Sequence, residues 1–284
     1  MKEFTSPLGI SIIVTIYNEA DHIVELLDSL VNQEEPIEIV IVDSMSNDGT
    51  DKIISNYMTR YGFIKYIRKK CSRGEGRNLG VASAKYQYLA FTDGDALANP
   101  FWIQRMRKAF LDGYDIVAGR TIQMGMSHFE HLGRVELYFE GFEVTFPSVN
   151  LGYRKSIFQE IGGFDPHFIT AEDIDLNIRA VMNGGKIRYV DDCLIYHRTR
   201  TTFSGFVQQA FWNGFGRKQL TYKHKHVWSH FKFSTILQRD QIGVWQLIRG
   251  ISAVVGYAVC KFFGDDFIRH YRKTERKNVS QEVG

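Results

Sequence analysis

Short, almost wholly apolar segments alternate with helical patterns along the first 120 residues, and this alternation restricts the fold more than any other feature. Strands are predicted at residues 12–16, 37–43, 63–67, 87–92 and 114–119. Apolar residues with the spacing of one helix face follow the first strand, at Ile23, Leu26, Leu27 and Leu30. Strands that are apolar throughout must be covered on both faces. The sequence therefore predicts an α/β fold with a mainly parallel central sheet flanked by helices.

Polar side chains stand where several of these strands end. Tyr17 follows the first strand, Asp43 closes the second, and Asp93 and Asp95 follow the fourth. In open parallel sheets, ligands bind beyond the carboxyl ends of the strands. We therefore expect a nucleotide-type site at that edge of the sheet.

The Asp93-Gly94-Asp95 sequence places two like charges almost side by side. A divalent cation relieves their repulsion by taking oxygen ligands, and it can neutralise a bound diphosphate at the same time. Gly94 lets a ligand approach the backbone closely. The same pattern also occurs in ordinary turns. Phosphatases of the haloacid dehalogenase type are disfavoured, because their paired aspartates normally follow the first strand, which ends here in TIYNEA.

Three other segments carry groups suited to chemistry. Glu172 and Asp173 open a predicted helix, where acidic residues also simply complement the helix dipole. His197 ends a strand-like segment, and a single histidine there is as compatible with a structural role as with metal binding. Arg77 lies in the glycine-rich segment SRGEGRNLG before a helix, which suits an anion.

The C-terminal part differs in charge and pattern. Beyond residue 120 we predict a helix over 126–144, and from residue 203 onward helical segments only. The net charge is +3, but residues 217–284 hold 13 Lys/Arg against 5 Asp/Glu, a surplus of +8. Residues 250–260 are the longest apolar stretch, shorter than the roughly 20 residues that span a bilayer. This stretch fits a helix in the membrane interface and a helix packed on the protein equally well.

The compartment is inferred from two simple features. Three cysteines without CxxC spacing argue against a disulfide framework and a zinc site. The N-terminal residues lack the apolar core of a signal peptide. We therefore expect a cytoplasmic protein, with a peripheral place on the cytoplasmic face of the membrane if the tail binds lipid.

Seven segments in order resemble family 2 glycosyltransferases: SIIVTIYNEADHI, IVDSMSNDGT, SRGEGRNLG, FTDGDA, GGFDPHF, EDIDLNIRAVMNGG and YHRTR. The resemblance covers about residues 10–217. It implies the GT-A fold, inverting chemistry and a nucleotide-diphosphate sugar donor, with a UDP-sugar favoured. It also implies a catalytic domain over 1–202, whose nucleotide-binding half is about 1–120 and whose acceptor-side half is 121–202. Residues 203–284 would form a helical C-terminal region.

The resemblance also implies roles for individual residues. Those of the donor site would be Thr15 and Tyr17 lining the base, Asp43 hydrogen-bonding it, Arg77 closing over it, and Asp93 with Gly94 at the ribose. Asp95 would hold Mn²⁺ or Mg²⁺, with His197 as a further ligand found in some members. Asp173 would be the catalytic base, and Glu172 would orient the acceptor.

The segment QQAFWNGFGR departs from the Q-x-x-R-W motif of processive members, because Phe211 stands in the arginine position. This favours transfer of a single sugar to a glycan or lipid-linked acceptor, with no role for nucleic acid. Arg217 matches a position that meets phosphate in non-processive members. Two alternatives remain open from the residues: a nucleotidyltransferase on a similar sheet, and a binding module that keeps the fold without catalysis.

Overall fold

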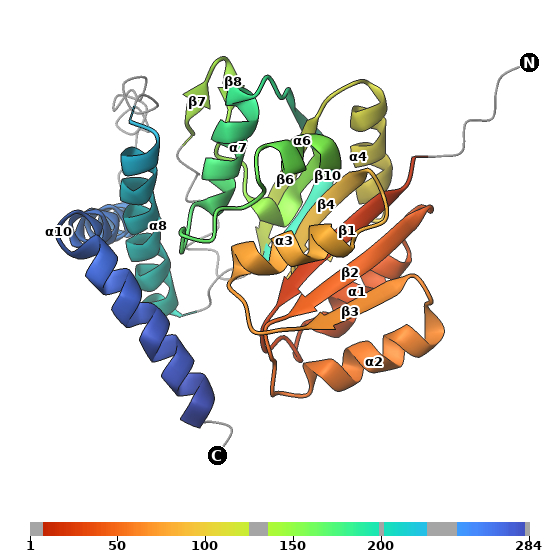
Figure 1. The fold of residues 1–284 in the computed structure, drawn as a ribbon, viewed down its shortest axis with the longest axis horizontal. Helices are drawn as coiled ribbons and strands as arrows, with labels where there is room; N and C mark the ends of the chain where they lie inside the picture. The colour runs from red at the N-terminus through yellow and green to blue at the C-terminus, as the bar shows by residue number, and fades with distance from the viewer. Residues whose placement is uncertain (1–7, 125–135, 199–201, 226–242, 282–284) are drawn as a thin grey trace, which may run out of the picture. The chain divides into compact units, whose positions relative to one another are not determined.

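The computed structural model describes residues 8–124, 136–198, 202–225 and 243–281. Eight strands form one sheet in the order β3-β2-β1-β4-β9-β6-β10-β5 (Figure 1). Their bounds are β1 Ile10–Ile16, β2 Ile37–Asp43, β3 Ile64–Arg68, β4 Tyr88–Asp93, β5 Ala96–Ala98, β6 Ile116–Met124, β9 Leu151–Arg154 and β10 Ile187–Arg198. Pairs β1–β2, β2–β3, β1–β4 and β6–β10 are parallel. Strand β9 is antiparallel to both β4 and β6, and β5 is antiparallel to β10. The predicted α/β class with a mainly parallel sheet is confirmed.

Helices flank the sheet, as the apolar strands require. In the part of the chain that holds the sheet they are α1 Ile23–Val31, α2 Thr50–Arg60, α3 Arg73–Ser83, α4 Trp102–Leu111, α6 Lys155–Glu160 and α7 Glu172–Met182. The C-terminal part holds two further helices, α8 Phe203–Lys223 and α10 Val244–Gln281. The short 3-10 helix η1 spans Ser148–Asn150. Side chains of β1 alternate between the two faces of the sheet. The even-numbered ones pack with α1 and α4, whereas Ile13 faces α3 at Gly80.

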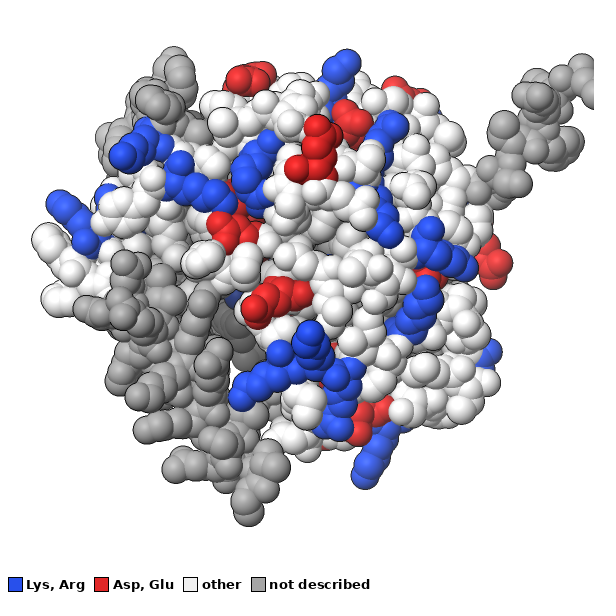
Figure 2. Space-filling view, viewed as in Figure 1, with Lys and Arg blue, Asp and Glu red and all other residues white. Residues whose placement is uncertain are grey.

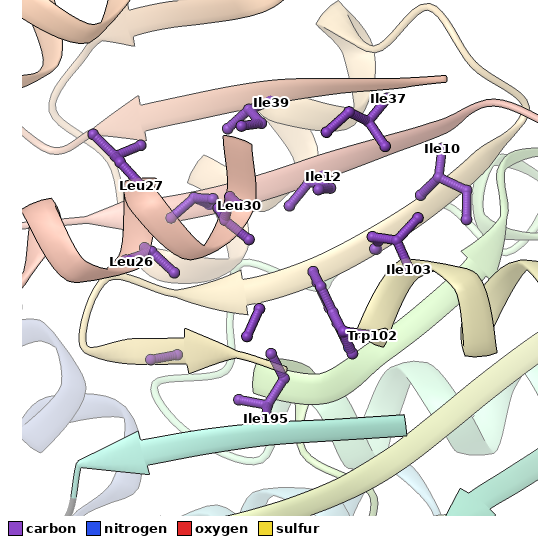
Figure 3. Close-up of a cluster of buried hydrophobic side chains, with 14 of the residues drawn as sticks. Ile10, Ile12, Leu26, Leu27, Leu30, Ile37, Ile39, Trp102, Ile103 and Ile195 are labelled. Atoms are coloured by element: carbon purple, nitrogen blue, oxygen red, sulfur yellow. The ribbon is translucent and has the colours of Figure 1, made fainter. Parts of the chain in front are cut away.

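The core cluster in Figure 3 shows why the first helix forms where the spacing predicts it. The four predicted residues of α1 are all fully buried, at Ile23, Leu26, Leu27 and Leu30. They meet Ile10 and Ile12 of β1, and Trp102 and Ile103 of α4 close the same cluster. This packing holds the first half of the sheet rigid beneath the edge where the strands end.

The predicted helix over residues 126–144 is wrong where the chain is described. Residues Tyr138–Phe139 (β7) and Phe142–Glu143 (β8) form a two-stranded hairpin. Glu140 and Gly141 between them have φ of 47° and 83°, the left-handed pair that a tight hairpin turn requires. Aromatic residues at 138, 139 and 142 fit either pattern, so the turn decides the structure. Residues 126–135 lie outside the described part of the chain.

The chain divides into two compact units. The first comprises residues 1–125, 136–166 and 173–199 and contains the sheet. The second comprises residues 126–135, 167–172 and 200–284 and contains α8 and α10. The described residues from 203 onward are helical apart from short connections, as predicted. The boundary at residue 202 and the two halves of the catalytic domain stay predictions.

Candidate functional site

Strand register brings the predicted donor-site residues to one edge of the sheet. Thr15 of β1 is paired with Val42 of β2 on one side and with Asp93 of β4 on the other. Ile16 is paired with Asp43. The strand ends of β1, β2 and β4 therefore form a continuous edge, from which Tyr17 projects with 42% of its surface exposed. Basic side chains gather on the face shown in Figure 2, in the lower part where the arrowheads of β1 to β3 point in Figure 1.

Asp43 is fully buried, and its carboxylate is engaged by the chain itself. Oδ1 accepts hydrogen bonds from the backbone N–H and the hydroxyl of Ser46, at 2.8 and 2.6 Å. Oδ2 accepts one from the Tyr66 hydroxyl. Burial and this bond raise the pKa of the Tyr66 phenol well above its usual range. Asp43 thus fixes the loop after β2, and Arg68 donates to the Ser46 carbonyl in the same loop.

Arg77 and Asp93 form an ion pair beneath this edge. Arg77 lies on α3 with 1% of its surface exposed, and its Nη2 is 2.7 Å from Asp93 Oδ1. Its guanidinium is 5.3 Å from the ring centroid of Phe164. Burial alone would raise the pKa of Asp93. The charges of Arg77, His197 and Arg73 outweigh it and lower that pKa below its usual value of 3.8. Asp93 is therefore ionised at neutral pH.

Two local features place Arg77 there. Ser72 caps α3 through a capping box with Glu75, which fixes the helix start. Glycine on the inner face then lets the helix approach the sheet closely: a Cβ at Gly76 would lie 3.1 Å from Thr15 Cγ2, and one at Gly80 would lie 2.5 Å from Ile13 Cγ2. The glycine-rich segment thus serves close packing of α3 against β1.

Asp95 and His197 meet although they are 102 positions apart in the chain. The antiparallel pairing of β10 with β5 aligns His197 with Ala96. The His197 Nε2 atom is 3.2 Å from Asp95 Oδ1, and both side chains are partly exposed. At Gly94 a Cβ would lie 2.7 Å from Glu19 Cγ, so only glycine fits between the two aspartates without a shift.

A divalent cation fits this pair by donor chemistry. A carboxylate oxygen and an imidazole nitrogen are both accepted ligands of Mn²⁺, and two protein donors leave positions for phosphate oxygens. Among the described residues, no group of three or more His, Cys, Asp or Glu side chains could hold a metal. A metal here would therefore depend on the bound diphosphate for part of its coordination.

Asp173 is oriented by backbone donors at the start of α7. Its Oδ2 accepts from the Ser148 N–H at 3.2 Å, and its Oδ1 accepts from the Ile174 N–H at 2.8 Å. Ala171, two residues before, has a φ of 62°, a conformation that costs energy for a residue with a Cβ. Glu172 is buried, with 6% of its surface exposed.

The geometry thus brings Thr15, Asp43, Arg77 and Asp93 together at the strand ends, and Asp95 with His197 beside them. Sequence reasoning missed four supporting residues: Ser46, Tyr66, Ser148 and Phe164. For Tyr66 a signal existed, because its predicted strand is the next one along the chain after the strand that ends at Asp43. The other three contacts depend on loop paths that no periodic pattern encodes.

Comparisons with known proteins agree on one family. The sequence model described as "Glycosyl transferase family 2" matches residues 11–162, and the one described as "Glycosyl transferase family group 2" matches residues 93–264. Glycosyltransferase AglE of Haloferax volcanii is 26% identical over 226 residues, which cover 74% of this chain and 73% of that protein. Several other curated relatives are much longer, and the matches span only 24% to 34% of their length.

Two solved structures show the same fold. One is TarS 1–349 of S. aureus in complex with UDP-GlcNAc, with a TM-score of 0.59 and 19% identity over 87% of this chain and 79% of that one. The other is a mannosyltransferase of Pyrobaculum calidifontis in complex with GDP-Man and Mn²⁺. It has a TM-score of 0.62 and 17% identity, over 94% of this chain and 79% of that one.

Proposed function

The chain belongs to glycosyl transferase family 2, and on that basis we propose that it is a metal-dependent, inverting enzyme that transfers one sugar from a nucleotide-diphosphate donor. It is a glycosyltransferase with the GT-A fold. The acceptor is a hydroxyl of a glycan or of a lipid-linked glycan. The observation that carries the proposal is the pair Asp95–His197, which lies next to the ion pair Arg77–Asp93 at the strand ends.

The donor nucleotide occupies the edge formed by β1, β2 and β4. Thr15 and the exposed ring of Tyr17 line the base, and Asp43 serves it by holding the loop after β2 in place. Arg77 and Asp93 are already paired at 2.7 Å. The ionised Asp93 reaches the ribose hydroxyls as a hydrogen-bond acceptor, while Arg77 would have to move to close over the base.

Asp95 and His197 would hold Mn²⁺ or Mg²⁺. When bound, the cation neutralises the diphosphate and stabilises it as a leaving group. A UDP-sugar is the first donor to test. The UDP-GlcNAc and GDP-Man of the two structural neighbours belong to those proteins, and they define the range of donors to compare.

Asp173 is the general base. It removes the proton of the acceptor hydroxyl while that oxygen attacks the anomeric carbon from the face opposite the diphosphate. The glycosidic bond forms with inverted configuration, the nucleoside diphosphate departs with the bonding electrons, and Asp173 is left protonated. The two backbone hydrogen bonds to its carboxylate keep it aimed, and Glu172 beside it orients the acceptor.

Calorimetric titration tests the donor and metal assignments together. UDP, GDP and dTDP are titrated with and without Mn²⁺ into the wild type and into Asp95→Asn, His197→Ala and Asp112→Asn, the last a surface carboxylate that pairs with Lys108. We expect metal-dependent binding of one nucleotide, weakened at least tenfold in the first two variants and unchanged in the third. Nucleotide binding that ignores both the metal and Asp95 would overturn the metal site.

The alternatives left open by the residues are weaker now. A nucleotidyltransferase would need a phosphate acceptor and has no use for a base at Asp173, and family membership favours sugar transfer. A binding module would have no need of Asp95, His197 and Asp173. Slow hydrolysis of a sugar nucleotide would distinguish a transferase from a binding module, because a transferase passes some sugar to water and a binding module does not. The basic helical C-terminal part supports a place at the cytoplasmic face of the membrane.

A further inference from the structure

The first part of α10 carries an exposed apolar face. Residues Val244–Gly264 have a mean hydropathy of 1.4 over their most apolar window, only 11% of which is buried, and by length and composition this segment could cross a membrane. It is longer than the eleven-residue stretch noted in the sequence. Besides Phe263, six of its apolar side chains are between 49% and 70% exposed: Val244, Leu247, Ile251, Val254, Val255 and Phe262. At about 100° per residue they fall within an arc of roughly 100° on the helix surface. We call these six residues the α10 stripe.

The side of α10 away from the stripe packs on α8. A Cβ at Gly214 would lie 1.8 Å from the Ala253 carbonyl oxygen, and one at Gly256 would lie 1.9 Å from that of Phe211. The backbones therefore touch, and only glycine permits it. Contacts also occur near both ends, where Trp245 packs against Phe203 and the Tyr222 hydroxyl donates to the Lys261 carbonyl. The two helices lie side by side over about 20 residues, in the same direction.

The positive charge of the α8–α10 pair indicates what kind of surface it binds. Residues 203–223 and 244–264 contain no Asp or Glu and five basic residues: Arg217, Lys218, Lys223, Arg249 and Lys261. An apolar face on a basic helix pair suits a membrane surface with anionic headgroups. Two copies pairing through the stripe would instead bring like charges together. Single exposed apolar residues are ordinary, but a continuous stripe of this size marks an interaction surface.

The position of α8 decides between crossing the membrane and lying on it. Because α8 runs beside the whole apolar part of α10, a crossing α10 would take α8 into the hydrocarbon. The polar side chains of α8 include the exposed Gln208, Gln209 and Asn213 and the charged Arg217 and Lys218. Charged residues in the hydrocarbon are expensive. We propose that the α10 stripe docks in the plane of an anionic bilayer surface, with α8 on its solvent side.

The same helix pair holds the residues that precede the proposed base. A Cβ at Gly216 of α8 would lie 2.6 Å from Thr170 Cγ2 and 2.9 Å from the Thr170 carbonyl oxygen. Gln219 donates to the His167 carbonyl at 3.3 Å, and Lys223 lies 5.3 Å from the Phe168 ring centroid. Docking thus ties the segment before Glu172 and Asp173 to the membrane surface. Docking itself is independent of the proposed function, whereas the choice of a lipid-linked acceptor rests on it.

Sedimentation with vesicles tests the docking. The full chain is mixed with vesicles of phosphatidylcholine alone or with about one third phosphatidylglycerol. The wild type is compared with Ile251→Asp/Val254→Asp in the stripe and with Leu111→Asp on α4, where Leu111 is 67% exposed. We expect the wild type to bind anionic vesicles, the stripe variant to lose at least tenfold in partitioning, and the Leu111 variant to keep it. Equal partitioning of the wild type and the stripe variant would overturn the proposal, as would absence of wild-type binding to any vesicle.

Four further readouts make each outcome decisive. Circular dichroism and the nucleotide titration show whether the stripe variant is folded and binds donor, so a failure of docking is distinguished from a failure of the proposed function. Alkaline carbonate should release the bound wild type, and retention would contradict the in-plane placement. If light scattering shows a dimer that the stripe variant abolishes, or if a protein partner displaces the vesicles through the stripe, the surface belongs to that partner and the lipid assignment is wrong.

Discussion

The strand-end site and the C-terminal helix pair are built in opposite ways. At the strand ends, polar groups are locked by partners from several elements: Asp43 by Ser46 and Tyr66, and Asp93 by Arg77. In the helix pair, contact is made by backbones at Gly214 and Gly256, and apolar side chains are left exposed. The first arrangement suits a ligand recognised by fixed hydrogen bonds. The second suits a surface whose partner supplies the missing apolar contacts.

Replacing the proposed base, Asp173, should slow sugar transfer strongly and leave donor binding almost unchanged. Asp173→Asn keeps the shape and one of the two backbone hydrogen bonds to the side chain, because its NH2 group cannot accept the other, and it removes the base. We expect transfer to fall by roughly 10²–10⁴-fold, while donor binding stays within about twofold of the wild type. The rate is measured as sugar transfer, or as slow hydrolysis of the sugar nucleotide until the acceptor is identified. Asp112→Asn is the control, and a rate within tenfold of the wild type in Asp173→Asn would show that another group is the base.

The buried ion pair gives the next effect. Arg77→Gln leaves Asp93 without its principal cation, and removing one partner of such a pair typically costs about 3–5 kcal/mol. The 21% exposure of the Asp93 side chain places the expected loss of unfolding free energy at the lower end of that range. Denaturant unfolding at pH 7 measures it. Arg60→Gln on α2, whose exposed side chain lies over the rings of Tyr57 and Tyr61, should change stability by less than about 0.5 kcal/mol.

The same pair predicts a dependence on pH. The pKa of Asp93 is lowered in the folded protein, so its contribution is complete above the usual value of 3.8 and is lost as the pH falls through the lower folded value. The wild type should therefore lose this stability only below about pH 4. In Arg77→Gln, where burial then dominates, the pKa of Asp93 rises above its unfolded value, so the folded variant takes up the proton first and its stability should increase as the pH falls from 7 toward 4. Unfolding curves between pH 3 and 7 test this, and identical pH profiles would contradict it.

Sequence patterns predicted the strand-end half well because its information is local. The strand at 37–43 was found with its observed bounds, and α1 buries the four residues that the spacing selects. The pairing of Asp95 with His197 was expected only through the family resemblance, because it depends on β10 returning beside β5. The hairpin at 138–143 was missed, because aromatic residues at 138, 139 and 142 are also compatible with a helix and the turn at Glu140-Gly141 decides.

The helix pair was harder to predict for a physical reason. Its contacts depend on the absence of side chains at Gly214 and Gly256, and a glycine within a helical pattern usually signals weakness rather than contact. From the sequence alone, the apolar residues of the α10 stripe also fit a helix packed on the protein, because the exposure of each side of α10 is known only from the structure. The roles of the individual site residues stay predictions, which the variants above address.

The close contact between α8 and α10 predicts a loss of stability when a side chain is added at Gly214. Gly214→Ala places a Cβ 1.8 Å from the Ala253 carbonyl oxygen, so the helices must separate. We expect a loss of about 1–3 kcal/mol, as for overpacked cores. The control, Gly250→Ala, meets nothing within 4 Å in the same helix pair and should be neutral or stabilising by up to about 1 kcal/mol. Nucleotide binding should be unaffected in both, because the strand-end site does not include these residues. Equal thermal stability of the two variants would contradict the close helix contact.

The smallest effect tests whether Asp43 acts by holding its loop. Tyr66→Phe removes the hydroxyl that donates to Oδ2 and leaves the ring in place, which should cost about 1–2 kcal/mol of unfolding free energy. If Asp43 serves the base by fixing the loop through Ser46, nucleotide affinity should fall only a few fold, because both Ser46 bonds to Oδ1 remain. Tyr61→Phe, at the half-buried C-cap of α2 and away from Asp43, is the control. A stronger affinity in Tyr66→Phe would mean that the tyrosine competes with the base for Asp43, and the carboxylate would then be a direct contact rather than a support for the loop.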